Sequence, residues 1–422
     1  DSFSGTDAAN NTLIGKNAGT AITTADDCVA VGEDALAGTT TGSNNIGIGV
    51  DALKANTTGT GNIGIGRRCL DSNTEGNLNV AVGQSALGAN TTADNNTAIG
   101  YAALNVNTTG TGNTALGKDT LDANTTGNYN VAIGLNALGA NTTADNNTAV
   151  GFSALIANTT GIQNIAVGGL ALTANTTGNY NTSMGYASLD ANTTASNNSA
   201  FGYNALGGNT TGANNSAVGY AALDANTTGN SNNAFGYEAL SDNTTGAQNC
   251  AFGHEALEDN TTADDNTAFG FRALRLNTTG TDNVAVGSLC LDANTTGSYN
   301  SSVGYGSLGA NTTGNANTSV GYNALVSNTE GNANVAVGGE CLDANTTGNY
   351  NTAVGKGALG ANTTANNNTA VGYNSLLLNT TGYSNVAVGN YTLDANTTAI
   401  YCTAVGYASL SANTTGNNNT GL

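Results

Sequence analysis

The sequence predicts an all-β fold, a single β-solenoid of 24 coils with 17 residues in each coil and no globular cap. One Gly recurs every 17 residues from Gly15 to Gly406, without a single insertion or deletion. The β-branched residues before this Gly favour an extended strand, while the abundant Asn, Thr and Gly are poor helix formers. We therefore expect each residue to lie directly above its counterpart in the previous coil.

The charge balance excludes two classes of partner. The 422 residues include 8 Lys and Arg against 28 Asp and Glu, a formal net charge of −20. Nucleic acids and anionic membranes attract clusters of basic side chains, so neither is an expected partner. No stretch is long and apolar enough to span a bilayer.

One coil has the consensus Asn-Thr-Ala-Val-Gly-Tyr-x-Ala-Leu-x-Ala-Asn-Thr-Thr-Gly-x-x. The residues before the first Gly favour a strand, Ala-Leu a second short strand or bend, and Asn-Thr-Thr-Gly a turn followed by extended backbone. The first Gly is present in all 24 coils, so we expect a positive φ there or a position where a Cβ would clash. The second Gly tolerates replacement and is expected to keep a negative φ; the substitutes are Ala93, Ala144, Ala195, Ala263, Ala365 and Ala399.

Two apolar ladders are expected to form a thin core. The residue immediately before the invariant Gly is apolar, as in Val31, Ile48, Met184, Phe201 and Val405. Leu recurs in 23 consecutive coils from Leu36 to Leu410, and the predicted core ladder includes Leu53, Leu87, Leu104, Leu138, Leu206, Leu240, Leu308 and Leu359. A core this thin favours lateral association with other chains.

Asn opens the Asn-Thr-Thr run in 22 consecutive coils, and in 20 of them Thr at the third place completes a glycosylation acceptor pattern. Two interpretations stay open: a ladder of hydrogen-bonded side-chain amides, or a covalent coat of N-linked glycans. The two exclude each other at any one residue, because the ladder uses the nitrogen that a glycan would occupy. O-linked glycans on the Thr residues are a third possibility. The candidates are Asn56, Asn90, Asn107, Asn124, Asn141, Asn158, Asn175, Asn192, Asn209, Asn226, Asn243, Asn260, Asn277, Asn294, Asn311, Asn345, Asn362, Asn379, Asn396 and Asn413.

No catalytic or metal-binding group is expected, no cofactor is implied, and the chain is not expected to be an enzyme. His254 is the single His, and no nucleophile recurs with it. The six Cys residues lack metal-binding spacing and mostly replace small residues, as buried thiols do. An aromatic residue follows the invariant Gly in 11 coils; it could bind sugars, contact a neighbouring chain, or simply be a half-exposed strand residue.

The strand Asn351 to Gly355 followed by Ala358 and Leu359 resembles the head repeats of trimeric autotransporter adhesins. It is also similar to repeats of phage tail fibres and other secreted bacterial fibres. The resemblance covers nearly the whole chain and implies left-handed β-rolls, homotrimers, a location at the cell surface, and adhesion. Adhesin heads usually have a shorter coil, and the Asn-Thr-Thr-Gly segment departs from them.

The whole chain, 1–422, is expected to form one solenoid, in register from residue 11 to residue 422. Residues 1–10 are a possible joint or donor strand between chains stacked head to tail. We expect a structural subunit of an extracellular fibre whose partner is itself, head to tail or side by side, and which carries glycans in one interpretation. The alternative is a homotrimeric surface adhesin or tail-fibre shaft that binds a cell-surface carbohydrate.

Overall fold

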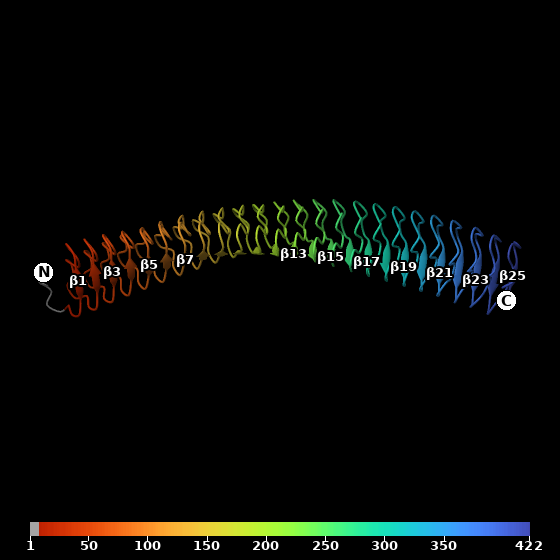
Figure 1. Ribbon diagram of the computed structural model, residues 1–422, viewed down its shortest axis with the longest axis horizontal. Helices are drawn as coiled ribbons and strands as arrows, with labels where there is room; N and C mark the ends of the chain where they lie inside the picture. Colours follow the sequence, from red (N-terminus) through yellow and green to blue (C-terminus); the bar gives the residue numbers. More distant parts are fainter. Residues whose placement is uncertain (1–7) are drawn as a thin grey trace. The chain divides into compact units, whose positions relative to one another are not determined.

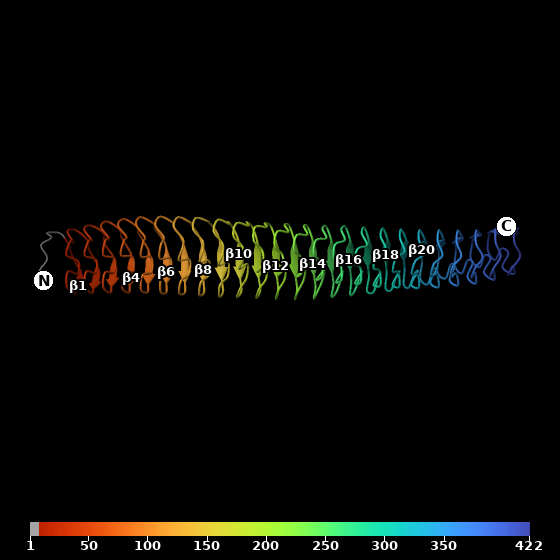
Figure 2. The ribbon, with the colours of Figure 1, turned by 90° about the horizontal axis from the view of Figure 1, so that it is seen from above.

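The computed structural model describes residues 8–422, and this part of the chain forms 25 short β-strands and no helix. The all-β β-solenoid of about 24 coils, with about 17 residues per turn, is confirmed. The coils group into two compact units, one ending at Thr211 and one spanning Gly212–Leu422. Within each unit the strands lie side by side, one per coil (Figures 1 and 2). Most of the predicted joint segment, residues 1–7, lies outside the described residues.

The strands of both units are three residues long, apart from the last. Those of the first unit are β1 (Thr12–Ile14), β2 (Val29–Val31), β3 (Ile46–Ile48), β4 (Ile63–Ile65), β5 (Val80–Val82), β6 (Thr97–Ile99), β7 (Thr114–Leu116), β8 (Val131–Ile133), β9 (Thr148–Val150), β10 (Ile165–Val167), β11 (Thr182–Met184) and β12 (Ser199–Phe201). Those of the second unit are β13 (Ser216–Val218), β14 (Asn233–Phe235), β15 (Cys250–Phe252), β16 (Thr267–Phe269), β17 (Val284–Val286), β18 (Ser301–Val303), β19 (Thr318–Val320), β20 (Val335–Val337), β21 (Thr352–Val354), β22 (Thr369–Val371), β23 (Val386–Val388), β24 (Thr403–Val405) and β25 (Thr420–Gly421).

Successive strands within a unit are parallel and paired in register. Ile63 lies opposite Val80 in β4 and β5, an offset of one repeat. Backbone hydrogen bonds between coils continue outside the strands, as from Leu53 N–H to the Cys69 carbonyl at 3.0 Å and from Thr57 N–H to the Thr74 carbonyl at 3.0 Å. The coils are therefore joined around much of their circumference and not by the strands alone.

The backbone turns at residues that have a positive φ. The invariant Gly has a positive φ, +138° at Gly66, and a Cβ added there would lie 2.6 Å from the carbonyl oxygen of Gly83. Both expectations for this Gly are thus confirmed, as is the negative φ at the second Gly position. The Leu in each of the 23 coils from Leu36 to Leu410 also has a positive φ, +52° at Leu53 and +53° at Leu325. A bulky side chain rarely adopts this conformation, and its cost of about 1–2 kcal/mol is opposed by complete burial of the Leu.

The core differs from the prediction in one ladder. The Leu ladder is fully buried from Leu36 to Leu393, including all eight residues predicted for it, and Leu410 in the last coil is partly buried. The residue before the invariant Gly is not core: Ile48 is 37% exposed, Phe201 38% and Met184 43%. Side chains alternate along a strand, so the small middle residue, such as Ala30 or Gly47, points inward and its neighbours point outward. The interior leaves little room, because a Cβ on Gly47 would lie 3.1 Å from Cγ of Leu36.

Candidate functional site

The Asn residues of the Asn-Thr-Thr run lie inside the solenoid as a ladder of amides. Asn90 Nδ2 donates to Oδ1 of Asn73 at 2.7 Å, and Asn107 Nδ2 donates to Oδ1 of Asn90 at 3.2 Å. The second N–H of Asn90 donates to the Ala93 carbonyl of its own coil at 3.1 Å. Both protons of the amide nitrogen are therefore used within the protein.

Of the 20 candidate Asn residues, all except Asn413 have no exposed surface, and Asn413 is partly buried. A glycan on such a nitrogen would replace the ladder bond and would have to occupy the core. The next Thr is half-buried, and its hydroxyl donates to the following coil, as from Thr57 to the Thr74 carbonyl at 2.9 Å. The third residue, such as Thr58, is exposed. This exposed row is the only part of the run with room for a covalent sugar.

A second buried Asn row precedes the strands, and it is not among the ladders predicted from the sequence. The backbone N–H of Asn62 donates to Oδ1 of Asn45 at 2.9 Å, and Asn62 Nδ2 donates to the Gly76 carbonyl at 2.8 Å. The same carbonyl accepts a 3.0 Å bond from Asn73 of the first ladder. This carbonyl thus links the two rows, and the Ala93 carbonyl links them in the same way through Asn79 and Asn90. The available signal was the recurrence of Asn every 17 residues before the strand, broken by Cys28 and Cys402.

Of the outward-facing strand residues, the one before the invariant Gly forms an apolar row along each unit. We call the residue before each invariant Gly the outer row. In the second unit this row comprises Val218, Phe235, Phe252, Phe269, Val286, Val303, Val320, Val337, Val354, Val371, Val388 and Val405. Nine of these twelve side chains are at least 36% exposed. The row is the largest departure from the expected burial of apolar residues.

Aromatic rings stack on one another along the rows of the second unit. Phe252 lies between Phe235 and Phe269, with ring centroids 5.2 and 4.9 Å apart and interplanar angles of 25° and 10°. In the row after the invariant Gly, the Tyr237 ring stacks on Tyr220 at 5.3 Å. Each inner ring therefore covers the face of its neighbours and leaves mainly its edge toward solvent.

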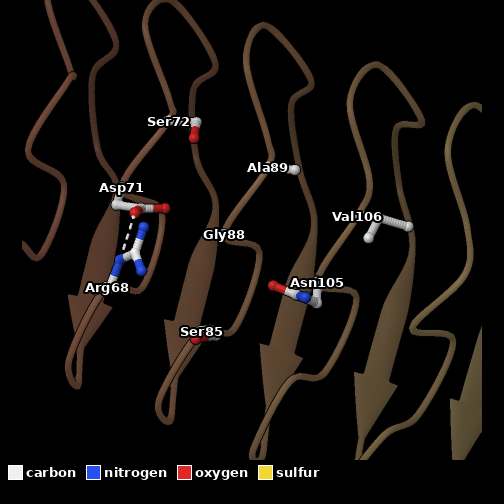
Figure 3. A pocket seen from close by; sticks show the side chains of 8 residues that line it. All are labelled: Arg68, Asp71, Ser72, Ser85, Gly88, Ala89, Asn105 and Val106. Atoms are coloured by element: carbon white, nitrogen blue, oxygen red, sulfur yellow. Dashed lines mark hydrogen bonds and ion pairs between the residues drawn. The ribbon is translucent and has the colours of Figure 1, made fainter.

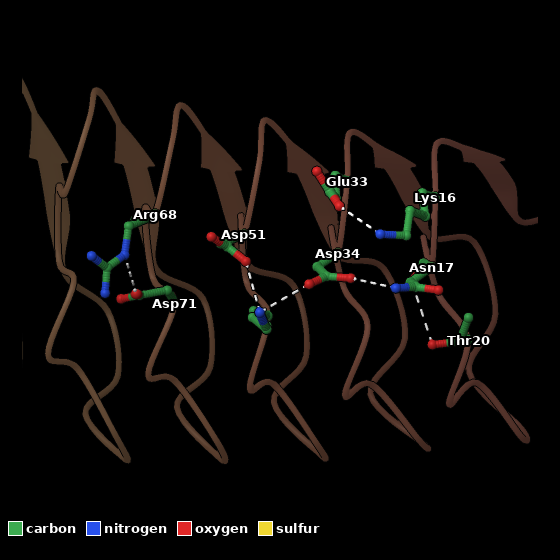
Figure 4. A network of polar contacts seen from close by, with 9 residues as sticks. Lys16, Asn17, Thr20, Glu33, Asp34, Asp51, Arg68 and Asp71 are labelled. Atoms are coloured by element: carbon green, nitrogen blue, oxygen red, sulfur yellow. Dashed lines mark hydrogen bonds and ion pairs between the residues drawn. The ribbon is translucent and has the colours of Figure 1, made fainter.

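The polar surface carries isolated ion pairs. In the first coils Lys54 Nζ lies 2.8 Å from Asp51 and 2.9 Å from Asp34, and Lys16 lies 3.1 Å from Glu33 (Figure 4). The hydrogen bond to Asp51 contributes most to raising the pKa of Lys54, and the bond to Asp34 contributes next. Exposed pairs of this kind contribute little to stability.

A shallow hollow of about 330 Å³ lies along three neighbouring coils (Figure 3). Arg68 and Asp71, the charged residues among the eight that line it, are directed at each other, and Arg68 Nε lies 3.1 Å from the carboxylate.

The thiols of Cys69 and Cys290 are buried. Burial raises the pKa of Cys69 to about 12 and that of Cys290 to about 11. A thiol with such a pKa is not a nucleophile at neutral pH.

Among residues 8–422 no three His, Cys, Asp or Glu side chains are grouped in a way that could hold a metal ion. The same residues include no helix suited to crossing a membrane. A scan against models of protein families found no match to this chain, and a search among curated proteins found none either.

Proposed function

We propose that the protein is a structural subunit of an extracellular fibre. The observation that carries this proposal is that one coil follows another with the same hydrogen bonds, through the strand register, the Asn ladder and the Thr hydroxyls. Each coil offers the next an almost identical set of donors and acceptors. Coils that repeat in this way stack along one axis, and a fibre is built by such stacking.

Stacking between chains uses the same chemistry. The bonds that join two coils involve backbone groups and residues present in nearly every coil, so they would equally join the coils of two chains placed head to tail. Fibre growth in this arrangement needs no new type of contact, and a head-to-tail contact that does not close produces a filament.

Electron microscopy of the purified chain tests this function. We expect filaments whose length grows with protein concentration and far exceeds one chain. Particles of uniform length at every concentration would refute head-to-tail growth.

A homotrimeric surface adhesin or tail-fibre shaft is the second candidate, favoured by three exposed Tyr side chains that lie three coils, or 51 residues, apart. Tyr299, Tyr350 and Tyr401 are 55–66% exposed. Unlike the buried rows, they leave more than half of their surface open to solvent. Binding of the intact chain to a panel of cell-surface carbohydrates, lost on replacing these three Tyr residues by Asn, would support adhesion.

A further inference from the structure

We infer that the outer row is a lateral interface at which a second copy of this chain binds, sheet face to sheet face. This inference deepens the proposed function, on which it rests, because it names the surface that would bundle chains within a fibre. Its starting point is an apolar row in the second unit in which Phe252 is 45% and Phe269 52% exposed. Contiguous exposed apolar surface on this scale marks an interaction site.

The distribution of charge favours a second copy as the occupant. The chain carries 28 acidic and 8 basic residues, yet within residues 8–422 no acidic or basic residue occupies an outward-facing position of a strand. Two chains of net charge −20 repel each other when charged faces meet. The strand face is the surface on which that repulsion is weakest and apolar burial is greatest.

The axial repeat also favours a second copy. Neighbouring parallel strands lie about 4.8 Å apart, so the outer row presents one side chain at each such step. A partner that fills every step needs a surface with the same spacing, and another solenoid of this sequence has it throughout. Ladders of identical side chains can then interdigitate as the paired sheets of a dry zipper do.

The stacked Phe residues argue against a carbohydrate at this surface. A sugar ring packs on the open face of an aromatic ring, but the faces of Phe252 are covered by Phe235 and Phe269. The edges that remain exposed suit insertion between side chains of a facing protein sheet. These three rings are therefore the expected centre of the interface, where a few large side chains supply most of the binding energy.

The test compares two triple variants. F235T/F252T/F269T removes three rings from the outer row and leaves β-branched residues that favour a strand. Y299N/Y350N/Y401N removes three exposed rings from another position of the coil, and Asn already occupies that position at Asn367 and Asn418. Circular dichroism and thermal unfolding establish that both variants keep the fold.

Sedimentation velocity and electron microscopy then measure association. We expect the wild type and the Tyr variant to associate laterally, and the Phe variant to need at least ten-fold more protein to do so. In micrographs the Phe variant should form filaments narrower than wild type but equally long. Unchanged width in the Phe variant, an equal loss in the Tyr variant, or a wild type that never pairs laterally would overturn the inference. Lateral pairs without long filaments would instead refute only the proposed fibre growth.

Discussion

At the residue scale, the two Gly positions of a coil differ in what a methyl group would meet. Gly66 has a positive φ, and its added Cβ would strike the backbone of the next coil. Gly76 also has close neighbours, the Ala93 carbonyl and the Asn73 amide, but its φ is negative. Seven coils, that of Ala25 among them, carry Ala at the Gly76 position, so small shifts must relieve that crowding. The decisive difference is the backbone conformation.

Replacing Gly66 by Ala should therefore destabilise the solenoid by about 3 kcal/mol or more, because strain and a backbone clash add together. Gly76→Ala in the same coil is the matched control and should cost less than about 1 kcal/mol. Thermal unfolding of the two variants provides the comparison, and equal losses would show that φ is not the cause.

The Asn ladder leads to a second prediction at this scale. Asn260 donates to Asn243 at 2.9 Å and accepts from Asn277 at 3.0 Å, so Asn260→Ala leaves Oδ1 of Asn243 and one N–H of Asn277 unpaired in the core. The other N–H of Asn277 keeps its bond to the Gly280 carbonyl. We expect a loss of roughly 2–5 kcal/mol, about 1–3 kcal/mol for each group. Denaturant unfolding measures this loss.

Thr262→Ala is the control for Asn260→Ala, because it removes the glycosylation pattern while keeping the amide, and Thr262 is exposed. It should leave stability nearly unchanged. Intact-protein mass spectrometry should find Asn260 unmodified in the folded chain. A sugar on that nitrogen would contradict the ladder.

Core polar residues show how local pairing preserves the coil. Ser183 and Ser188 replace two inward-facing residues of one coil, and the Ser183 hydroxyl donates to the Ser188 carbonyl at 2.8 Å. Ser302 and Ser307 repeat the exchange, with the Ser302 hydroxyl 3.0 Å from the Ser307 carbonyl. A buried hydroxyl is tolerated because a partner lies within reach.

At the element scale, the strand could be located from the sequence but its inward face could not. Val, Ile and Thr before Gly406 and its equivalents marked the strand correctly. The outer residue before the invariant Gly is more apolar than the middle Ala, so hydrophobicity alone assigned the wrong residue to the core. What decides is the available space, since Leu fills the interior and admits only a small neighbour. The positive φ of the Leu residues could not be predicted from the sequence either, because Gly or Asn is the usual residue at that φ.

Two substitutions in one coil test this assignment. Leu325 is fully buried, so Leu325→Ala should destabilise the chain by about 2–5 kcal/mol. Val320 is 39% exposed, so Val320→Thr, which keeps a β-branched residue, should cost less than about 1 kcal/mol. Unfolding is best followed at low protein concentration, where lateral contacts do not contribute. If Val320→Thr lowered the free energy of unfolding more than Leu325→Ala, the outer row would have to be assigned to the core.

At the scale of the whole molecule, acidic residues dominate and several are partly buried. Burial raises the pKa of Asp122, Asp190 and Asp343, each directly after the Leu of its coil. The bond to Arg272 acts in the other direction at Glu255 and lowers the pKa of that carboxyl. With a formal net charge of −20, mutual repulsion adds to the cost of keeping the partly buried groups ionised.

The protein should consequently become more stable as the pH falls from about 7 to about 5. A carboxyl whose pKa is higher in the folded than in the unfolded state binds protons first in the folded state, so the free energy of unfolding rises as pH falls toward the folded-state pKa. Thermal midpoints at the two pH values measure the effect. D122N/D190N/D343N should raise the midpoint at pH 7 and reduce its pH dependence. Added salt at about 0.5 M screens repulsion but not burial. A midpoint that falls on acidification at both salt concentrations would refute the prediction.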